Sequence, residues 1–126
     1  MVKAGEDITV ITYGAGVLWA MEYQEQHTAI SLHILDLRSL LPLDYNAIKE
    51  AVAKTGKVLL LHEDTLTGGI GGEISAWISE HGWELMVGSG MCFAAMDTPV
   101  AFKMGRGKNF RARSRLEEYV NKLMKY

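Results

Sequence analysis

The amino-acid sequence predicts an α/β fold in which a mainly parallel sheet carries helices on both faces. Short apolar and β-branched runs alternate with segments of helical spacing, and glycine, proline or aspartate separates one from the next. This alternation is typical of consecutive strand–helix–strand units, because parallel strands need a long crossover between them. With 126 residues the chain is expected to form one domain with a proper hydrophobic core.

Two strands and one helix are predicted in the first third of the chain. Residues Ile8 to Tyr13 are β-branched or aromatic, and Ser31 to Leu37 are nearly all apolar, so both segments predict strands. Gly14-Ala15-Gly16 is expected to turn the first strand into a helix of about Val17 to Gln26. The weakly apolar face of this helix contains Val17, Leu18 and Met21.

The second helix has signals at both of its ends. Asp44 follows Pro42 and is well placed to cap a helix from Tyr45 to Lys54. Gly56 is expected to stop this helix, whose last turn carries Lys54. The residues expected to be buried are Ile48, Ala51 and Val52.

A buried strand and a polar, glycine-rich turn occupy the centre of the sequence. Val58 to Leu61 is entirely apolar, as is typical of a strand covered on both faces. His62-Glu63-Asp64 and the glycines after them are expected to form the turn. Helical spacing resumes from Ile70 to His81, and Gly82 ends that helix. Its core-facing residues are expected to be Ile74, Trp77, Ile78 and His81.

The last third of the chain predicts a fourth strand, a basic loop and a final helix. The strand is expected over Met91 to Met96, and Asp97-Thr98-Pro99 breaks it. Residues 103–115 carry several Lys and Arg and no acid, which indicates a solvated loop leading into the helix. The helix, over about 114–126, is expected to start with a capping box of Ser114 and Glu117. It should bury Leu116, Val120 and Leu123.

Composition excludes several classes of protein. A net charge of −2 argues against a general nucleic-acid-binding surface. Cys92 is the one cysteine, which rules out an intrachain disulfide and a cysteine-based zinc cage. The sequence contains neither a long apolar run nor a signal-peptide pattern, so we expect a cytoplasmic protein without membrane contact.

The first glycine turn raises a nucleotide-binding hypothesis. Gly14 and Gly16 follow a strand, and Asp36 ends the next strand at about the distance of a ribose-binding acid. The fingerprint needs a third glycine where the helix packs on the strand, and Trp19 occupies that position. Glycines that merely permit a tight turn are the favoured interpretation, and a stand-alone nucleotide-binding domain remains an alternative.

The central turn allows two interpretations. His62 and Glu63 could belong to an acid–base or metal site, yet neighbouring residues of a strand point to opposite faces. The glycine cluster, including Gly68 and Gly69, fits neither dinucleotide nor P-loop spacing. We therefore favour His62, Glu63, Gly68 and Gly69 as a structural and interface turn without catalytic, cofactor-binding or metal-binding residues.

Several blocks of sequence resemble a known family in their order and spacing. These blocks are Gly5 to Gly14, Asp36 to Asp44, Thr55 to Lys57, His62 to Gly69 and Asp97 to Pro99. They resemble the C-terminal domain of the transketolase superfamily, and within it the beta chain of 2-oxoacid dehydrogenase decarboxylase components of the pyruvate or branched-chain type. The resemblance covers about residues 5 to 102. The chain departs from the family pattern at Val87-Gly88-Ser89 and after Phe102.

The resemblance implies a three-layer α/β/α domain with a five-stranded mixed sheet, one strand running against the others. It implies a parent enzyme that uses thiamine diphosphate and magnesium to decarboxylate a 2-oxoacid and acylate a lipoyl group. The cofactor lies between other domains of that enzyme, so we expect an excised domain that binds no cofactor and is inactive alone. A transketolase or deoxyxylulose-phosphate synthase parent shares the fold and is an alternative.

The resemblance also implies protein partners. They are the other domains or chains of the decarboxylase component and the basic subunit-binding domain of a dihydrolipoyl acyltransferase, and the family's subunit contacts also allow a homodimer. The acids Glu73 and Glu80 lie on the predicted helix after the glycine turn. Because the partner is basic, these two carboxylates are the expected docking residues.

Overall fold

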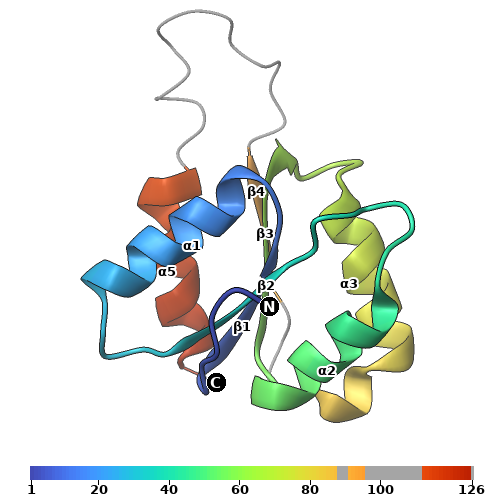
Figure 1. The fold of residues 1–126 in the computed structure, drawn as a ribbon, viewed down its shortest axis with the longest axis horizontal. Helices are drawn as coiled ribbons and strands as arrows, with labels where there is room; N and C mark the ends of the chain where they lie inside the picture. The colour runs from blue at the N-terminus through green and yellow to red at the C-terminus, as the bar shows by residue number, and fades with distance from the viewer. Residues whose placement is uncertain (88–90, 96–111, 126) are drawn as a thin grey trace, which may run out of the picture.

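The computed structural model contains a four-stranded parallel sheet of strand order β2-β1-β3-β4 (Figure 1). It describes residues 1–87, 91–95 and 112–125, with the backbone alone for 91–95 and 112–114. All four predicted strands are present, which confirms the mainly parallel sheet. They are β1 (Ile8–Thr12), β2 (Leu32–Asp36), β3 (Val58–Thr65) and β4 (Met91–Ala95).

Helices cover both faces of this sheet, as the sequence predicts. Figure 1 shows α1 and α5 on one face and α2 and α3 on the other, with the sheet seen nearly edge-on between them. Each helical layer buries its own apolar cluster against the sheet. The helices are α1 (Ala15–Gln26), α2 (Tyr45–Thr55), α3 (Ile70–His81), the short 3-10 helix η1 (Trp83–Leu85) and α5 (Ala112–Leu123).

The fifth, antiparallel strand that the family resemblance implies is not among the residues that the structure describes. In that part of the chain all strand pairs are parallel, apart from an isolated antiparallel bridge of Lys3 with Ile34. There the Ile34 N–H donates to the Lys3 carbonyl at 2.8 Å, and the Val2 N–H donates to the Ile34 carbonyl at 2.9 Å. The N-terminal segment therefore lies along the outer edge of β2.

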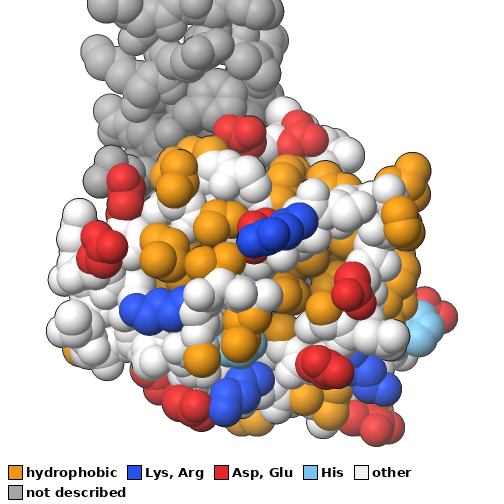
Figure 2. Space-filling model, viewed as in Figure 1, with side chains coloured by type: hydrophobic (Ala, Val, Ile, Leu, Met, Phe, Trp, Pro, Cys, Tyr) orange, Lys and Arg blue, Asp and Glu red, His pale blue; other side chains and the backbone are white. Residues whose placement is uncertain are grey.

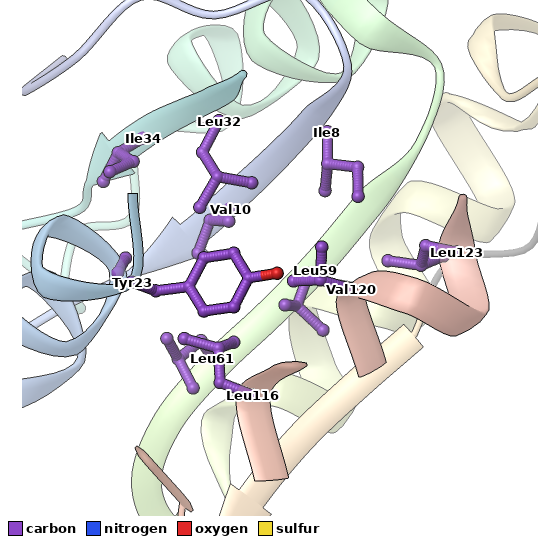
Figure 3. Close-up of a cluster of buried hydrophobic side chains, with 11 residues drawn as sticks. Ile8, Val10, Tyr23, Leu32, Ile34, Leu59, Leu61, Leu116, Val120 and Leu123 are labelled. Carbon is purple, nitrogen blue, oxygen red and sulfur yellow. The ribbon is translucent and has the colours of Figure 1, made fainter. Parts of the chain in front are cut away.

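The first apolar cluster joins α1, α5 and the sheet. Figure 3 shows Tyr23 of α1 among side chains of the strands, facing those of α5. The three residues predicted to face the core from the last helix, Leu116, Val120 and Leu123, are all buried here. That helix begins at Ala112, so Ser114 lies inside it and the predicted N-terminal capping box is wrong.

The buried face of α1 differs from the predicted one. Gly16, Ala20, Tyr23 and Gln24 are buried, whereas Leu18 is 66% exposed and Val17 and Met21 are partly buried. Small residues at Gly16 and Ala20 let the helix approach the sheet closely, and the aromatic Tyr23 then fills the core. A prediction from the spacing of apolar residues misses this face, because it treats the buried Gln24 as a polar surface residue.

Gln24 is buried because its side-chain amide satisfies three backbone groups. Its Nε2 donates to the carbonyls of His27 at 3.0 Å and Ile30 at 2.8 Å, and its Oε1 accepts from the Leu32 N–H at 2.6 Å. A buried amide is tolerated only when it is hydrogen-bonded in this way. Gln24 therefore fixes the connection from α1 to β2.

The signals at both ends of α2 are confirmed. Asp44 Oδ1 accepts a hydrogen bond from the Ala47 N–H at 3.0 Å, and Gly56 has a left-handed φ of 67° after the last turn. Lys54 in that turn forms an ion pair of 2.9 Å with Glu6. The predicted core residues, Ile48, Ala51 and Val52, are buried.

The central strand is longer than predicted. β3 continues to Thr65, so His62, Glu63 and Asp64 belong to the strand and not to the turn. Pairing with β4 extends this far, because Thr65 pairs with Ala95 after a shift of register beyond Leu61. Backbone pairing with a neighbouring strand thus overrides the low strand propensity of the charged residues.

The helix after the glycine turn spans the predicted residues. Ile74 and Ile78 are buried and Trp77 is partly buried, while His81 is exposed, contrary to prediction. None of the described helices is both long and apolar enough to cross a membrane. The side chain of Cys92, the predicted break at Asp97-Thr98-Pro99 and residues 103–111 of the predicted basic loop lie outside the described residues.

Candidate functional site

The sequence candidates gather at the edge of the sheet where the parallel strands end. From β1 the chain passes through α1 to β2 on one side, whereas β3 is followed by β4 on the other side. The strand order therefore reverses between β1 and β3, which is the position where open α/β sheets bind ligands. Tyr13 and Gly14 follow β1 there, and His62 to Thr65 form the end of β3.

His62 is buried at this edge of the sheet. Its side chain is 2% exposed, and its ring lies nearly parallel to that of Tyr13, with 6.2 Å between the ring centroids. Burial lowers the pKa of His62, and the charge and backbone hydrogen bond of Asp64 act against this shift. Burial also raises the pKa of Tyr13, with smaller contributions from Asp64 and Glu63. Both rings are thus favoured in their neutral forms.

The carboxylates beside His62 do not converge on it. Glu63 and Asp64 are exposed, whereas His62 is buried, and alternation along the strand places Glu63 on the side opposite to His62. Asp64 Oδ1 accepts from the Thr65 N–H at 2.8 Å, so its carboxylate orders its own strand end. Among the described residues, no three His, Cys, Asp or Glu side chains are grouped so that they could hold a metal ion. Whether the turn is purely structural stays a prediction.

The glycines of the turn have two distinct roles. Gly68 adopts a left-handed φ of 76°, which glycine tolerates best. Gly69 has an ordinary extended backbone, but a Cβ there would lie 2.8 Å from Cε1 of His62 and would overlap the carbonyl oxygen of Thr65. The start of α3 therefore packs directly onto His62. A contact of this turn with a neighbouring subunit stays a prediction.

The residues of the nucleotide-binding hypothesis share the same edge. Gly14 has a left-handed φ of 56° and is exposed, and Gly16 is buried against Thr12. Asp36 already has partners, because it accepts from the Arg38 N–H at 3.1 Å and lies 3.4 Å from Arg38 Nε. A ribose would have to displace this pair.

Trp19 stands at the position where the dinucleotide-binding fingerprint requires its third glycine. Trp19 is partly buried and packs against the apolar cluster between α1 and the sheet. Gly16 holds the first turn of α1 close to Thr12 and Leu61, but a bulky side chain stands where the fingerprint requires its third glycine. The geometry brings Gly14 and Asp36 to neighbouring strands without completing the dinucleotide fingerprint.

The two predicted docking acids lie on the surface of α3, Glu73 in its first turn and Glu80 near its end. Glu73 and Glu80 are exposed, and Trp77 lies between them at helical positions i, i+4 and i+7. Sequence reasoning missed that Tyr45, at the start of α2, contacts Trp77, with 4.7 Å between the ring centroids. The one signal for this contact was the aromatic character of both positions, since they are far apart in the chain.

Comparison with known proteins gives a family match for most of the chain. Residues 1–106 match the family "Transketolase, C-terminal domain". The chain is 46% identical over 100 residues to the 2-oxoisovalerate dehydrogenase subunit beta of Bacillus subtilis. This alignment covers 78% of the chain and 28% of that protein. The chain is also 34% identical over 109 residues to the chloroplastic pyruvate dehydrogenase E1 component subunit beta-2 of Arabidopsis thaliana. That alignment covers 81% of the chain and 26% of the relative.

A solved structure gives the same fold. It is described as a split gene transketolase, inactive beta4 tetramer, and it matches with a TM-score of 0.79 at 20% sequence identity. The match covers 98% of this chain and 41% of that one. The chain spans about a quarter of the length of the curated relatives that it matches.

Proposed function

This chain belongs to the transketolase C-terminal domain family, and from that premise we propose that it is the assembly domain of a 2-oxoacid dehydrogenase decarboxylase component. The parent enzyme would decarboxylate a 2-oxoacid and transfer the acyl group to a lipoyl group. The domain would contribute subunit contacts and no catalytic residue of its own. The observation that carries this proposal is the sequence match to beta subunits of such dehydrogenases.

The sequence relatives favour a 2-oxoacid dehydrogenase parent over a transketolase or deoxyxylulose-phosphate synthase parent. The first relatives are beta subunits of branched-chain or pyruvate dehydrogenases. The transketolase structure is only 20% identical and supports the fold alone. A cytoplasmic location also remains our proposal.

Thiamine diphosphate and magnesium belong to the parent enzyme in this proposal. Magnesium is held by oxygen ligands in octahedral geometry, together with the phosphates of the cofactor. Among the described residues no three acidic or histidine side chains are grouped so that they could ligate a metal, and in this proposal the cofactor lies between other domains of the parent enzyme. We therefore assign no catalytic step to this part of the chain.

Docking of an acyltransferase is proposed at α3. Glu73 and Glu80 are exposed on this helix, which carries no Lys or Arg. A basic subunit-binding domain would meet an acidic face there, and such complementarity speeds association and selects the partner. The contact should weaken with added salt, because exposed charges are screened.

Titration calorimetry of the subunit-binding domain against the full chain tests this docking. We expect binding at low salt that weakens at high salt. The double variant Glu73→Gln/Glu80→Gln should lose roughly tenfold in affinity, since exposed ion pairs contribute up to about 1 kcal/mol each. Glu25→Gln on α1 is the matched control, because it removes an exposed carboxylate from another helix. Absence of binding at low salt would exclude docking at this domain.

Two further proposals have simple tests. A homodimer is proposed from the family's subunit contacts, and light scattering of the purified chain would detect it. The nucleotide-binding alternative rests on Gly14, Gly16 and Asp36 at one edge of the sheet. A rise in melting temperature with NAD or ATP that Asp36→Asn abolishes would favour this alternative over the assembly domain.

A further inference from the structure

Three neighbouring aromatic rings lie at the surface of α2 and α3: Trp77 and His81 are stacked, with 12° between their planes, and Tyr45 is tilted by 31° to Trp77. Tyr45 of α2 lies 4.7 Å from Trp77, and His81 lies 5.0 Å from Trp77 on the other helix, measured between ring centroids. Tyr45 is 40% exposed and His81 is exposed, while Trp77 is partly buried against the core. The inner ring is therefore held by packing, and the two outer rings are accessible to solvent. We call Tyr45, Trp77 and His81 the aromatic stack.

The surroundings of the aromatic stack are acidic. Glu73 and Glu80 flank Trp77 on α3, and the Glu80 carboxylate lies 3.9 Å from His81 Nδ1. Figure 2 shows acidic and hydrophobic side chains, with some Lys or Arg side chains among them, over the region that Figure 1 assigns to α2 and α3. From residue 58 to residue 102 the sequence contains no Lys or Arg. Its acids are Glu63, Asp64, Glu73, Glu80, Glu84 and Asp97.

Exposed aromatic rings beside carboxylates favour the binding of an arginine side chain. An arginine guanidinium is planar, stacks on aromatic faces and binds a carboxylate through two parallel hydrogen bonds. A lysine would gain the charge attraction and little of the stacking. Tyr, Trp and Arg are also the residues that most often dominate the binding energy of protein interfaces.

We propose that the aromatic stack is a docking site for an arginine of a basic partner protein, with Glu73 or Glu80 holding the guanidinium. This inference rests on the proposed function, because it names the group that the acidic face of α3 recognises. Lys49, one turn after Tyr45 on α2, is the nearest base in sequence to the stack. Its removal should not weaken binding.

A second copy of this chain is not the expected occupant. In a twofold contact the same surface of both copies meets, so the carboxylates of Glu73 and Glu80 would be present on both sides of the contact. Like charges brought together in this way oppose association. The face is therefore complementary to a basic partner and not to itself.

The first experiment uses a probe that does not depend on the acyltransferase. A short peptide of alternating arginine and glycine is titrated into the full chain by calorimetry, beside the same peptide with lysine in place of arginine. We expect the arginine peptide to bind roughly threefold to fivefold more tightly, as cation–π contacts at exposed sites imply. Equal affinities, or no binding of the arginine peptide, would overturn the inference.

Variants of the stack locate the contact. Tyr45→Leu and His81→Leu should each lower the affinity for the arginine peptide by about threefold and leave the lysine peptide nearly unchanged. Trp77→Leu is the stronger change, but it also removes core packing, so the other two variants remain decisive if it unfolds. Trp83→Leu is the matched control, because Trp83 is 65% exposed and lies outside the stack. An equal effect of the control would overturn the inference.

The subunit-binding domain of the acyltransferase then separates this inference from the proposed function. If that domain fails to bind while the arginine peptide binds at the stack, the proposed docking partner is wrong and the arginine site stands. If the domain binds and Tyr45→Leu and His81→Leu leave its affinity unchanged, the proposed function stands and the arginine site is wrong. If the domain binds and both variants weaken it by about threefold, both are supported.

Discussion

Adding one methyl group at Gly69 should destabilise the protein, whereas adding it at Gly72 should stabilise it. A Cβ at Gly69 would overlap the Thr65 carbonyl and approach Cε1 of His62 to 2.8 Å, although its backbone angles suit alanine. A Cβ at Gly72 meets nothing within 4 Å and lies inside α3. The same substitution three positions apart therefore tests the packing of the turn.

The magnitudes follow from the two environments. Overpacking at Gly69 costs about 1–3 kcal/mol, whereas replacing Gly72 in a helix contributes about 0.5–1 kcal/mol. For 126 residues, 1 kcal/mol corresponds to roughly 4 °C in melting temperature. We expect Gly69→Ala to melt about 4–12 °C lower and Gly72→Ala about 2–4 °C higher. Thermal unfolding followed by circular dichroism measures both.

A third variant separates packing from helix capping. Gly69 is the N-terminal cap of α3, where serine is preferred over glycine and alanine is poor. If capping alone decided stability, Gly69→Ser would raise the melting temperature. Because the new Cβ meets the same carbonyl oxygen, we expect Gly69→Ser to melt lower than the unmodified protein. A Gly69→Ser variant as stable as the parent would refute the packing of α3 onto His62.

Two further outcomes concern buried polar groups. Gln24→Leu keeps the volume but removes three hydrogen bonds, so urea unfolding should show a loss of about 2–4 kcal/mol, whereas Gln26→Leu at the exposed helix end should change little. Burial lowers the pKa of His33 and of His62 below the unfolded value of 6.5, so the unfolded chain binds more protons below that pH. Stability should therefore fall as the pH drops from 6.5 towards the folded pKa values. The variant His33→Gln/His62→Gln should flatten this part of the urea profile, and an unchanged slope would contradict the assignment.

Sequence patterns predicted the parts of the fold that local chemistry decides. The cap at Asp44 and the stop at Gly56 depend on residues within one helical turn, so both could be inferred and both are confirmed. The four strands also followed from composition, because each contains an apolar core segment. Their parallel pairing follows from the intervening crossovers.

The parts that were missed depend on contacts between distant segments. β3 runs through His62 to Thr65 because β4 pairs with it, and no local pattern shows this. Gln24 is buried because backbone groups beyond its own helix need its amide. Tyr45 and Trp77 meet only after two helices have packed on the same face of the sheet. Candidate sites read from the sequence alone therefore missed the aromatic stack.

The outer edge of β2 has a consequence for how the protein behaves at high concentration. An unpaired edge strand is a template on which another chain can add and start an aggregate. Here the Leu32 N–H is occupied by Gln24 and the Ile34 peptide groups by residues 2 and 3. Residues 2 and 3 thus cover part of this edge and hinder the addition of another strand to the sheet. Deleting residues 1–4 should clearly increase aggregation at high protein concentration and should lower the melting temperature only slightly.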